Sequence, residues 1–153
     1  MKRLALIACA TALVACGTKK PAEVPPPPPA AEPAAPAPIS MADLTGTWDV
    51  KSTAQGSDSA LVTYTLTATA DTTGWTVTFP GRKPMAVRVM ASGDSITIDA
   101  APFQSMLRKG VKVTTHSVAR LVGGQLVGTT VAHYQTKSAD SVATRTLTGT
   151  KKP

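Results

Sequence analysis

The sequence predicts an all-β domain, with eight antiparallel strands in an up-and-down meander over residues 44–150. Threonine and valine dominate this part of the chain, and apolar residues alternate with polar ones at a period of two. Turn-forming residues recur about every 10 to 15 positions, which is typical of short strands joined by tight turns. The alternation gives each strand one buried face and one solvated face, as in antiparallel sheets.

Five runs with this alternation fill the first part of the domain. They are predicted at 44–53, 61–70, 74–79, 84–91 and 95–100. In each run we expect the larger apolar residues to share the inward face. In chain order, these inward faces contain Trp48, Tyr64, Trp75 with Phe79, Met85 with Val87, and Ile96 with Ile98.

Three longer runs complete the meander, at 111–122, 125–136 and 140–150. Gly123-Gly124 separates the first two and can supply the two positive φ angles of a two-residue hairpin turn. That turn places His116 opposite Val131, and it places His133 on the same outer face. Tyr134 falls on the inward face.

Residues 101–110 form the longest connection in the meander, and long loops often carry function. Pro102 is suited to start a short helix there. We predict that the segment folds over one barrel opening, with Phe103 and Leu107 inward and Arg108 at the rim. Arg108 would then meet an anionic group of a bound ligand. The alternative is a structural plug that only closes the barrel end.

A repeated tetrapeptide bears on whether the first and last strands of the sheet pair with each other. Leu-Thr-Gly-Thr occurs at 44–47 and again at 147–150. Either threonine-rich strands repeat by chance, or the first and last strands lie side by side and close a barrel. Closure removes exposed sheet edges. An eight-stranded barrel is filled by its own side chains or holds one small ligand.

The first predicted strand, Leu-Thr-Gly-Thr-Trp-Asp-Val, resembles the Gly-x-Trp motif of lipocalins and the related avidin-like barrels at Gly46 and Trp48. The resemblance implies a lipocalin-like closed barrel that binds a ligand. It also implies that an arginine on a late strand, here Arg145, packs over the tryptophan. On this basis we expect the ligand-binding residues to be Trp48, Tyr64, Trp75, Phe103, Arg108 and Tyr134.

The first 15 residues have the pattern of a secretory signal peptide. The basic pair Lys2-Arg3 precedes an apolar run of 12 residues, which is too short to span a bilayer. Leu-Val-Ala-Cys at 13–16 resembles the lipobox of bacterial lipoproteins. That resemblance implies removal of residues 1–15 and acylation of Cys16, although a plain thiol is the alternative. Gly17 resembles the residues that permit export to the outer membrane, facing the periplasm in a Gram-negative cell.

Residues 16–43 would then be the lipidated N-terminus and a linker rich in proline and alanine. Five consecutive prolines at 25–29 exclude helix and sheet and favour extended polyproline II. The stretch 21–38 would reach about 55 Å as a semi-rigid spacer. Proline-rich stretches also bind the aromatic grooves of partner proteins, and we favour the spacer over this alternative.

Charge and motifs exclude several function classes. The formal net charge of +7 falls to +5 when Lys2 and Arg3 leave with the signal, and the remaining basic residues are too scattered for a nucleic-acid site. No nucleophile motif, phosphate loop or metal-ligand spacing is present, so we expect no enzyme activity, no cofactor and no metal. His116 and His133 lack an evident third ligand.

Two functions remain. The first is a lipid-anchored binding module of the cell envelope that holds a small apolar or amphipathic ligand in the barrel. The second is a structural or protein-interaction lipoprotein with a filled barrel, no ligand and a protein partner in the envelope. Both attach to the membrane through acylated Cys16.

Overall fold

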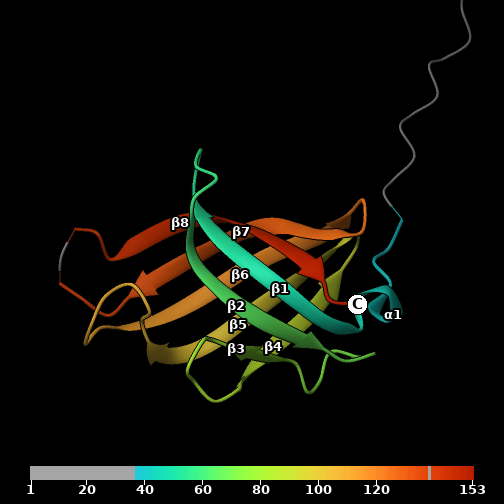
Figure 1. The fold of residues 1–153 in the computed structure, drawn as a ribbon, viewed down its shortest axis with the longest axis horizontal. Coiled ribbons are helices and arrows are strands. Elements are labelled where there is room, and N and C mark those ends of the chain that lie inside the picture. The colour runs from blue at the N-terminus through green and yellow to red at the C-terminus, as the bar shows by residue number, and fades with distance from the viewer. Residues whose placement is uncertain (1–36, 138) are drawn as a thin grey trace, which may run out of the picture. The chain divides into compact units, whose positions relative to one another are not determined.

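The computed structural model describes residues 37–137 and 139–153, so Cys16 and the predicted signal peptide lie outside the described residues. It contains a short helix, α1 (Met41–Leu44), and eight strands (Figure 1). The strands are β1 (Gly46–Ala54), β2 (Ala60–Ala68), β3 (Thr76–Thr78), β4 (Met85–Ser92), β5 (Ser95–Gln104), β6 (Lys112–Val122), β7 (Gln125–Tyr134) and β8 (Val142–Lys151).

The eight strands form a closed antiparallel barrel in sequence order, which confirms the predicted fold class. Each strand pairs with the next along the chain, and β1 pairs with β8 to complete the circle. The Gly123-Gly124 turn sets the predicted register, because His116 lies opposite Val131. The first and last strands are therefore neighbours, as the closure hypothesis required, although only Gly46 and Thr47 of the first Leu-Thr-Gly-Thr lie in β1.

The first strand begins later than predicted. Leu44 was expected in a strand, but it ends α1, and β1 starts at Gly46. The helix is one turn that lies across one end of the barrel, and Leu44 is completely buried there. The Leu44 carbonyl accepts a hydrogen bond of 2.8 Å from the Trp48 indole N–H, which explains why the chain turns before it enters the sheet.

The helix predicted from Pro102 is also absent, because β5 continues through this residue to Gln104. The β5–β6 register shifts between Ala100 and Phe103, so residues 101–102 form a bulge. Proline has no N–H to donate, and a bulge is one of the few places in a sheet that tolerates it. Phe103 resumes the ladder opposite Val113.

The two ends of the barrel differ. At one end, α1 and the segment before it cover the interior: the Ile39 N–H donates to the Gly93 carbonyl at 2.8 Å, and Lys151 Nζ donates to the Asp43 carbonyl at 3.2 Å. We call this the closed end. The other end carries four loops, at 55–59, 79–84, 105–111 and 135–141, which we call the mouth loops. No helix among the described residues is long and apolar enough to span a membrane.

Most of the predicted inward aromatic residues are buried. Trp48 and Trp75 are 1% and 0% exposed, and Phe79 and Tyr134 are also in the core. The Trp75 indole N–H donates to the Asp71 carbonyl at 2.7 Å, so both indoles are satisfied. Tyr64 is half-buried and packs against the core cluster.

Arg145 does not pack over Trp48, so this expectation from the lipocalin resemblance is wrong. The β1–β8 register places Arg145 opposite Ala54 and Lys151 opposite Trp48. The two β8 residues are separated by about 20 Å along the strand, given about 3.4 Å per residue. Lys151 instead provides the cation, with Nζ 5.6 Å from the centre of the Trp48 ring system.

Gly128 on β7 lies opposite Ala119 on β6, and a Cβ added at Gly128 gives a test of the packing. A Cβ at Gly128 would approach the Ala119 Cα to 2.7 Å and would clash with the Val118 carbonyl oxygen. A Cβ at Gly149 would meet the Leu126 Cβ at 3.1 Å and the Val50 Cγ2 at 3.4 Å, a milder overlap that a shift of a few tenths of an ångström relieves.

We predict that Gly128→Ala lowers the free energy of unfolding by about 1–3 kcal/mol, toward the upper end of this range, because the backbone of β6 must move to admit the methyl group. Gly149→Ala serves as the matched control and should cost less. Urea denaturation measures both free energies of unfolding. Equal costs at the two glycines would contradict the β6–β7 packing described above.

Candidate functional site

A cavity lies inside the barrel, in the half next to the mouth loops. Its volume is about 80 Å³, measured as the space open to the centre of a water molecule. One water needs about 10–15 Å³ of such space, so the cavity holds on the order of five to eight waters or a ligand of similar size. It is smaller than the roughly 300–1,000 Å³ of most ligand pockets.

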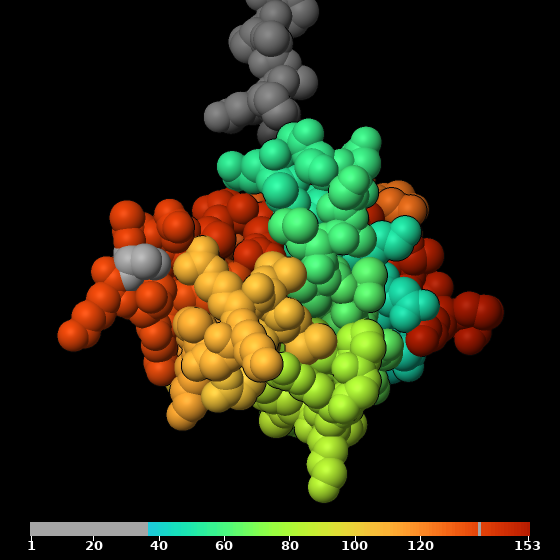
Figure 2. All heavy atoms as spheres, turned by 60° about the vertical axis from the view of Figure 1, so that its left-hand side comes forward, coloured from blue at the N-terminus to red at the C-terminus, as the bar shows by residue number. Residues whose placement is uncertain are grey.

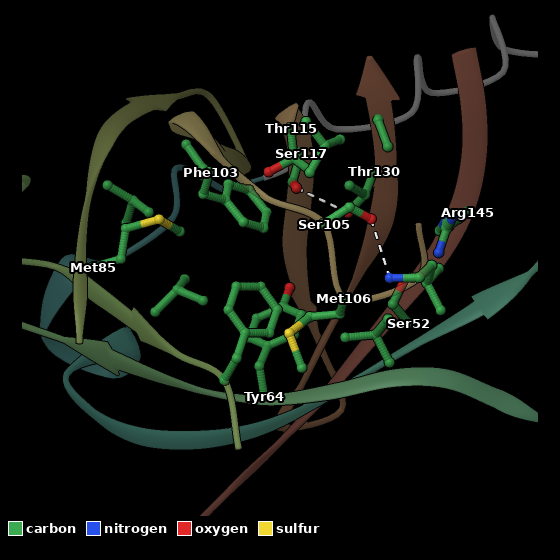
Figure 3. A pocket seen from close by; sticks show the side chains of 18 of the residues that line it. Ser52, Tyr64, Met85, Phe103, Ser105, Met106, Thr115, Ser117, Thr130 and Arg145 are labelled. Carbon is green, nitrogen blue, oxygen red and sulfur yellow. Dashed lines mark hydrogen bonds between the residues drawn. The ribbon is translucent and has the colours of Figure 1, made fainter. Parts of the chain in front are cut away.

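One side of the cavity is apolar and rich in aromatic rings (Figure 3). The ring of Phe79 packs between those of Tyr64 and Phe103. Its centre is 5.4 Å from the Tyr64 ring centre and 5.3 Å from the Phe103 ring centre. Met85 and Val87 extend this side. Burial raises the pKa of Tyr64 above the ordinary tyrosine value of 10.0, so its phenol is neutral at physiological pH.

The opposite side of the cavity carries hydroxyl groups. Ser117 and Thr130 are both buried and share a hydrogen bond of 2.8 Å between their side-chain oxygens. Ser52, from β1, is buried nearby. Each of these residues lies on the inward face of its strand, where the other positions are mainly apolar. The hydroxyls therefore form a local polar wall in an apolar interior.

Arg145 is the charged residue of the cavity lining, and no acidic residue lies beside it there. Its Nη2 donates a hydrogen bond of 2.6 Å to the Tyr134 hydroxyl. Its Nε is buried and has no hydrogen-bond partner, and within the described residues no carboxylate forms an ion pair with Arg145. The Arg145 side chain as a whole is half-buried, but a guanidinium nitrogen that is buried without a hydrogen-bond partner is costly unless another group supplies an acceptor. Figure 3 shows Arg145 across the cavity from Met85.

The β5–β6 loop lies over the cavity in the centre of the mouth (Figure 2). Ser105 is buried, and its Oγ accepts hydrogen bonds from the N–H groups of Leu107 at 3.1 Å and Arg108 at 3.0 Å. Met106 and Leu107 line the cavity but remain 39% and 40% exposed. The Arg108 guanidinium carbon lies 4.1 Å from the Tyr134 ring centre.

Tyr134 therefore joins the two arginines: Arg108 covers its ring, and Arg145 binds its hydroxyl. Both guanidinium groups lie at the polar side of the mouth, without a described carboxylate close enough for an ion pair. This is the arrangement expected for a site that takes an anionic group from outside the chain.

The structure divides the six residues that the sequence suggested as ligand contacts. Tyr64, Phe103 and Tyr134 line the cavity, whereas Arg108 reaches it only through Tyr134. Trp48 and Trp75 do not line it; they belong to the packed core. Sequence reasoning missed Arg145 as a cavity residue, although an arginine on the inward face of a strand was a usable signal.

The side chains of His116 on β6 and His133 on β7 lie on the outer face of the barrel wall. His116 Nδ1 is 2.6 Å from an Asp99 carboxylate oxygen, and both residues are partly exposed. Within residues 37–137 and 139–153, no group of three or more histidine, cysteine, aspartate or glutamate side chains is placed to hold a metal ion.

We predict that Tyr134→Phe lowers the free energy of unfolding by about 1.5–3 kcal/mol, because it leaves a second nitrogen of Arg145 without its acceptor. Tyr64→Phe is the control, since the Tyr64 hydroxyl makes no hydrogen bond to a described residue, and it should cost much less. Urea denaturation compares the two variants. A neutral Tyr134→Phe would show that water satisfies Arg145 equally well.

Comparisons of the chain with protein-family models, with curated proteins and with solved structures gave no match. The likeness to lipocalins at Gly46 and Trp48 therefore stays a prediction. Any function assigned to the chain depends on the geometry of the cavity and the mouth loops.

Proposed function

We propose that the barrel is a lipid-anchored binding module for a small amphipathic anion. The observation that carries this proposal is the buried Nε of Arg145, which has no partner in a cavity that is otherwise mainly apolar. The ligand's anionic group would lie at Arg145, and its apolar part would lie against Tyr64 and Phe103.

The chemistry of arginine supports a carboxylate or a similar planar anion. The guanidinium carries five N–H donors, and Tyr134 accepts only one of them in the structure. A carboxylate can accept two parallel hydrogen bonds from such a group, and charge-assisted bonds of this kind are the strong ones. Binding would also give the buried Nε an acceptor and place a negative charge beside the guanidinium, so the ligand and Arg145 stabilise each other.

The size of the cavity limits the ligand. Space for about five to eight waters suits a short aliphatic or aromatic carboxylate with a similar number of non-hydrogen atoms. A longer ligand would extend past Met106 and Leu107, which stand between the cavity and solvent. Arg108 would then be the second basic group along its path, consistent with its place beside Tyr134.

The anchoring part of the proposal depends on residues before the barrel. Leu-Val-Ala-Cys at 13–16 supports acylation of Cys16, and the proline-rich stretch supports a spacer of about 55 Å between the lipid anchor and the barrel. We place the protein in the cell envelope on this basis, at the outer membrane if the cell is Gram-negative.

A second candidate is a structural or protein-interaction lipoprotein with no ligand. The small cavity favours it, and so does an apolar strip on the outer wall. Met90 and Val118 are 50% and 44% exposed, and both pair with Thr97, so they lie in one row across β4, β5 and β6. Native mass spectrometry of the protein from its own envelope separates the two candidates: a co-purifying small molecule favours the first, and a protein favours the second.

We predict that the full chain binds hexanoate more tightly than hexanol, because only the carboxylate can pair with Arg145. Arg145→Met should weaken hexanoate binding roughly tenfold or more and leave hexanol binding nearly unchanged. Arg145→Lys should restore part of the preference. Isothermal titration calorimetry measures these affinities.

Arg88→Met, on the outer wall, is the control for the loss of one positive charge. Equal weakening of hexanoate binding by Arg88→Met and Arg145→Met would refute a specific anion site. So would equal affinity of the unsubstituted protein for the acid and the alcohol.

We predict that Cys16 is the first residue of the mature protein and carries the lipid. Mass spectrometry of the protein from washed membranes should show an acylated N-terminal cysteine, and Cys16→Ser should release the protein from the membrane fraction. A mature N-terminus at any other residue would contradict the anchor without affecting the cavity argument.

A further inference from the structure

The mouth of the barrel is strongly basic. Among the described residues of the mouth loops and the adjoining start of β6, six are basic and two are acidic. The basic residues are Arg82, Lys83, Arg108, Lys109, Lys112 and Lys137, and the acidic ones are Asp58 and Asp140. All of them are exposed except Arg108, which is half-buried.

The closed end has a different balance. Asp43 lies in α1, Asp71 and Asp94 lie in the connections, and Asp49 forms an ion pair of 3.0 Å with Lys152. Arg120 and Lys151 are the other basic residues near these strand ends, so four acidic residues face three basic ones there, whereas the mouth has an excess of positive charge. The asymmetry gives the barrel one end suited to an anionic surface.

The mouth loop at 105–111 also presents exposed apolar side chains. Met106 and Leu107 are adjacent, exposed by 39% and 40%, and followed directly by Arg108 and Lys109. The loop is held in shape, because the Ser105 N–H donates to the Val111 carbonyl at 2.9 Å and the Val111 N–H donates to the Arg108 carbonyl at 3.2 Å. Figure 2 shows this loop in the middle, with the other mouth loops around it.

We infer that the mouth docks on the surface of a lipid bilayer that contains anionic lipids. The two apolar side chains would enter the boundary between headgroups and acyl chains, and the surrounding lysine and arginine side chains would contact the anionic headgroups. An acidic protein would satisfy the charges but gives no reason for a pair of apolar residues at the centre of the basic ring.

This inference goes beyond the proposed ligand and does not require it. Docking in this orientation would set the cavity opening against the lipid, so an amphipathic molecule could pass between bilayer and barrel without crossing water. The surface itself is tested without any ligand, and its failure would leave the hexanoate experiment unaffected.

The buried native tryptophans allow a direct test on the full chain. Trp48 and Trp75 are shielded from lipid, so a tryptophan introduced at the mouth supplies the lipid-dependent signal. Leu107→Trp protein is mixed with vesicles whose acyl chains carry bromine, which quenches tryptophan fluorescence on contact. We expect quenching by vesicles of phosphatidylcholine with about one third phosphatidylglycerol, weaker quenching by phosphatidylcholine alone, and loss of the effect at high salt.

Matched controls separate the mouth from the rest of the surface. Val118→Trp, on the outer wall, should not be quenched even if the N-terminal segment binds vesicles. In the Leu107→Trp protein, Lys83→Gln with Lys109→Gln should lower the apparent affinity for anionic vesicles roughly tenfold or more. Arg120→Gln with Lys152→Gln removes the same charge at the closed end and should have little effect.

Three results would overturn the inference. The first is equal quenching at positions 107 and 118, and the second is absence of quenching at 107 with anionic vesicles. The third is equal loss of affinity from the two pairs of charge substitutions. Binding of polyglutamate without quenching by vesicles would instead assign the mouth to an acidic polymer.

Discussion

The pairing of β1 with β8 is the constraint on which the rest of the structure depends. It closes the sheet, so the first and last strands do not end in free edges. It also fixes how deep each β8 side chain lies in the barrel: Lys151 reaches Trp48, and Arg145 is carried toward the mouth, opposite Ala54. With another register, the arginine would lie in the packed half and the cavity would have no charge.

The half-buried Arg145, with a buried Nε that has no partner, costs the barrel stability. Leucine or methionine at this position would fill the interior without a polar group that needs a partner, and such replacements often stabilise a protein. The chain instead positions an arginine against Tyr134, with Arg108 on the other side of the same tyrosine. In the proposed function, the anion supplies the hydrogen-bond acceptor that the Arg145 Nε lacks in the structure.

The strand count, the closure and the inward aromatic residues could be predicted from the sequence, because alternation and the repeated Leu-Thr-Gly-Thr are local signals. The depth of a side chain along the barrel axis could not be predicted, because it depends on the shear between distant strands. Alternation predicted that Trp48 and Tyr64 both face inward, but it did not show that Trp48 lies in the packed core and Tyr64 in the cavity wall. Pro102 misled for a related reason. A proline looks like a helix start locally, and only the pairing of Phe103 with Val113 shows that it lies in a bulge.

The chain enters the domain at the closed end, where Ile39 bonds to Gly93 and Leu44 is buried above Trp48. A pull applied to the chain at residue 37 would therefore act first on the closed end. The load would pass into the start of β1, where it acts as shear on the hydrogen bonds to β2 and β8. Because the β1–β8 ladder runs from Trp48 to Ala54, the hydrogen bonds that close the barrel would share this load along most of the strand.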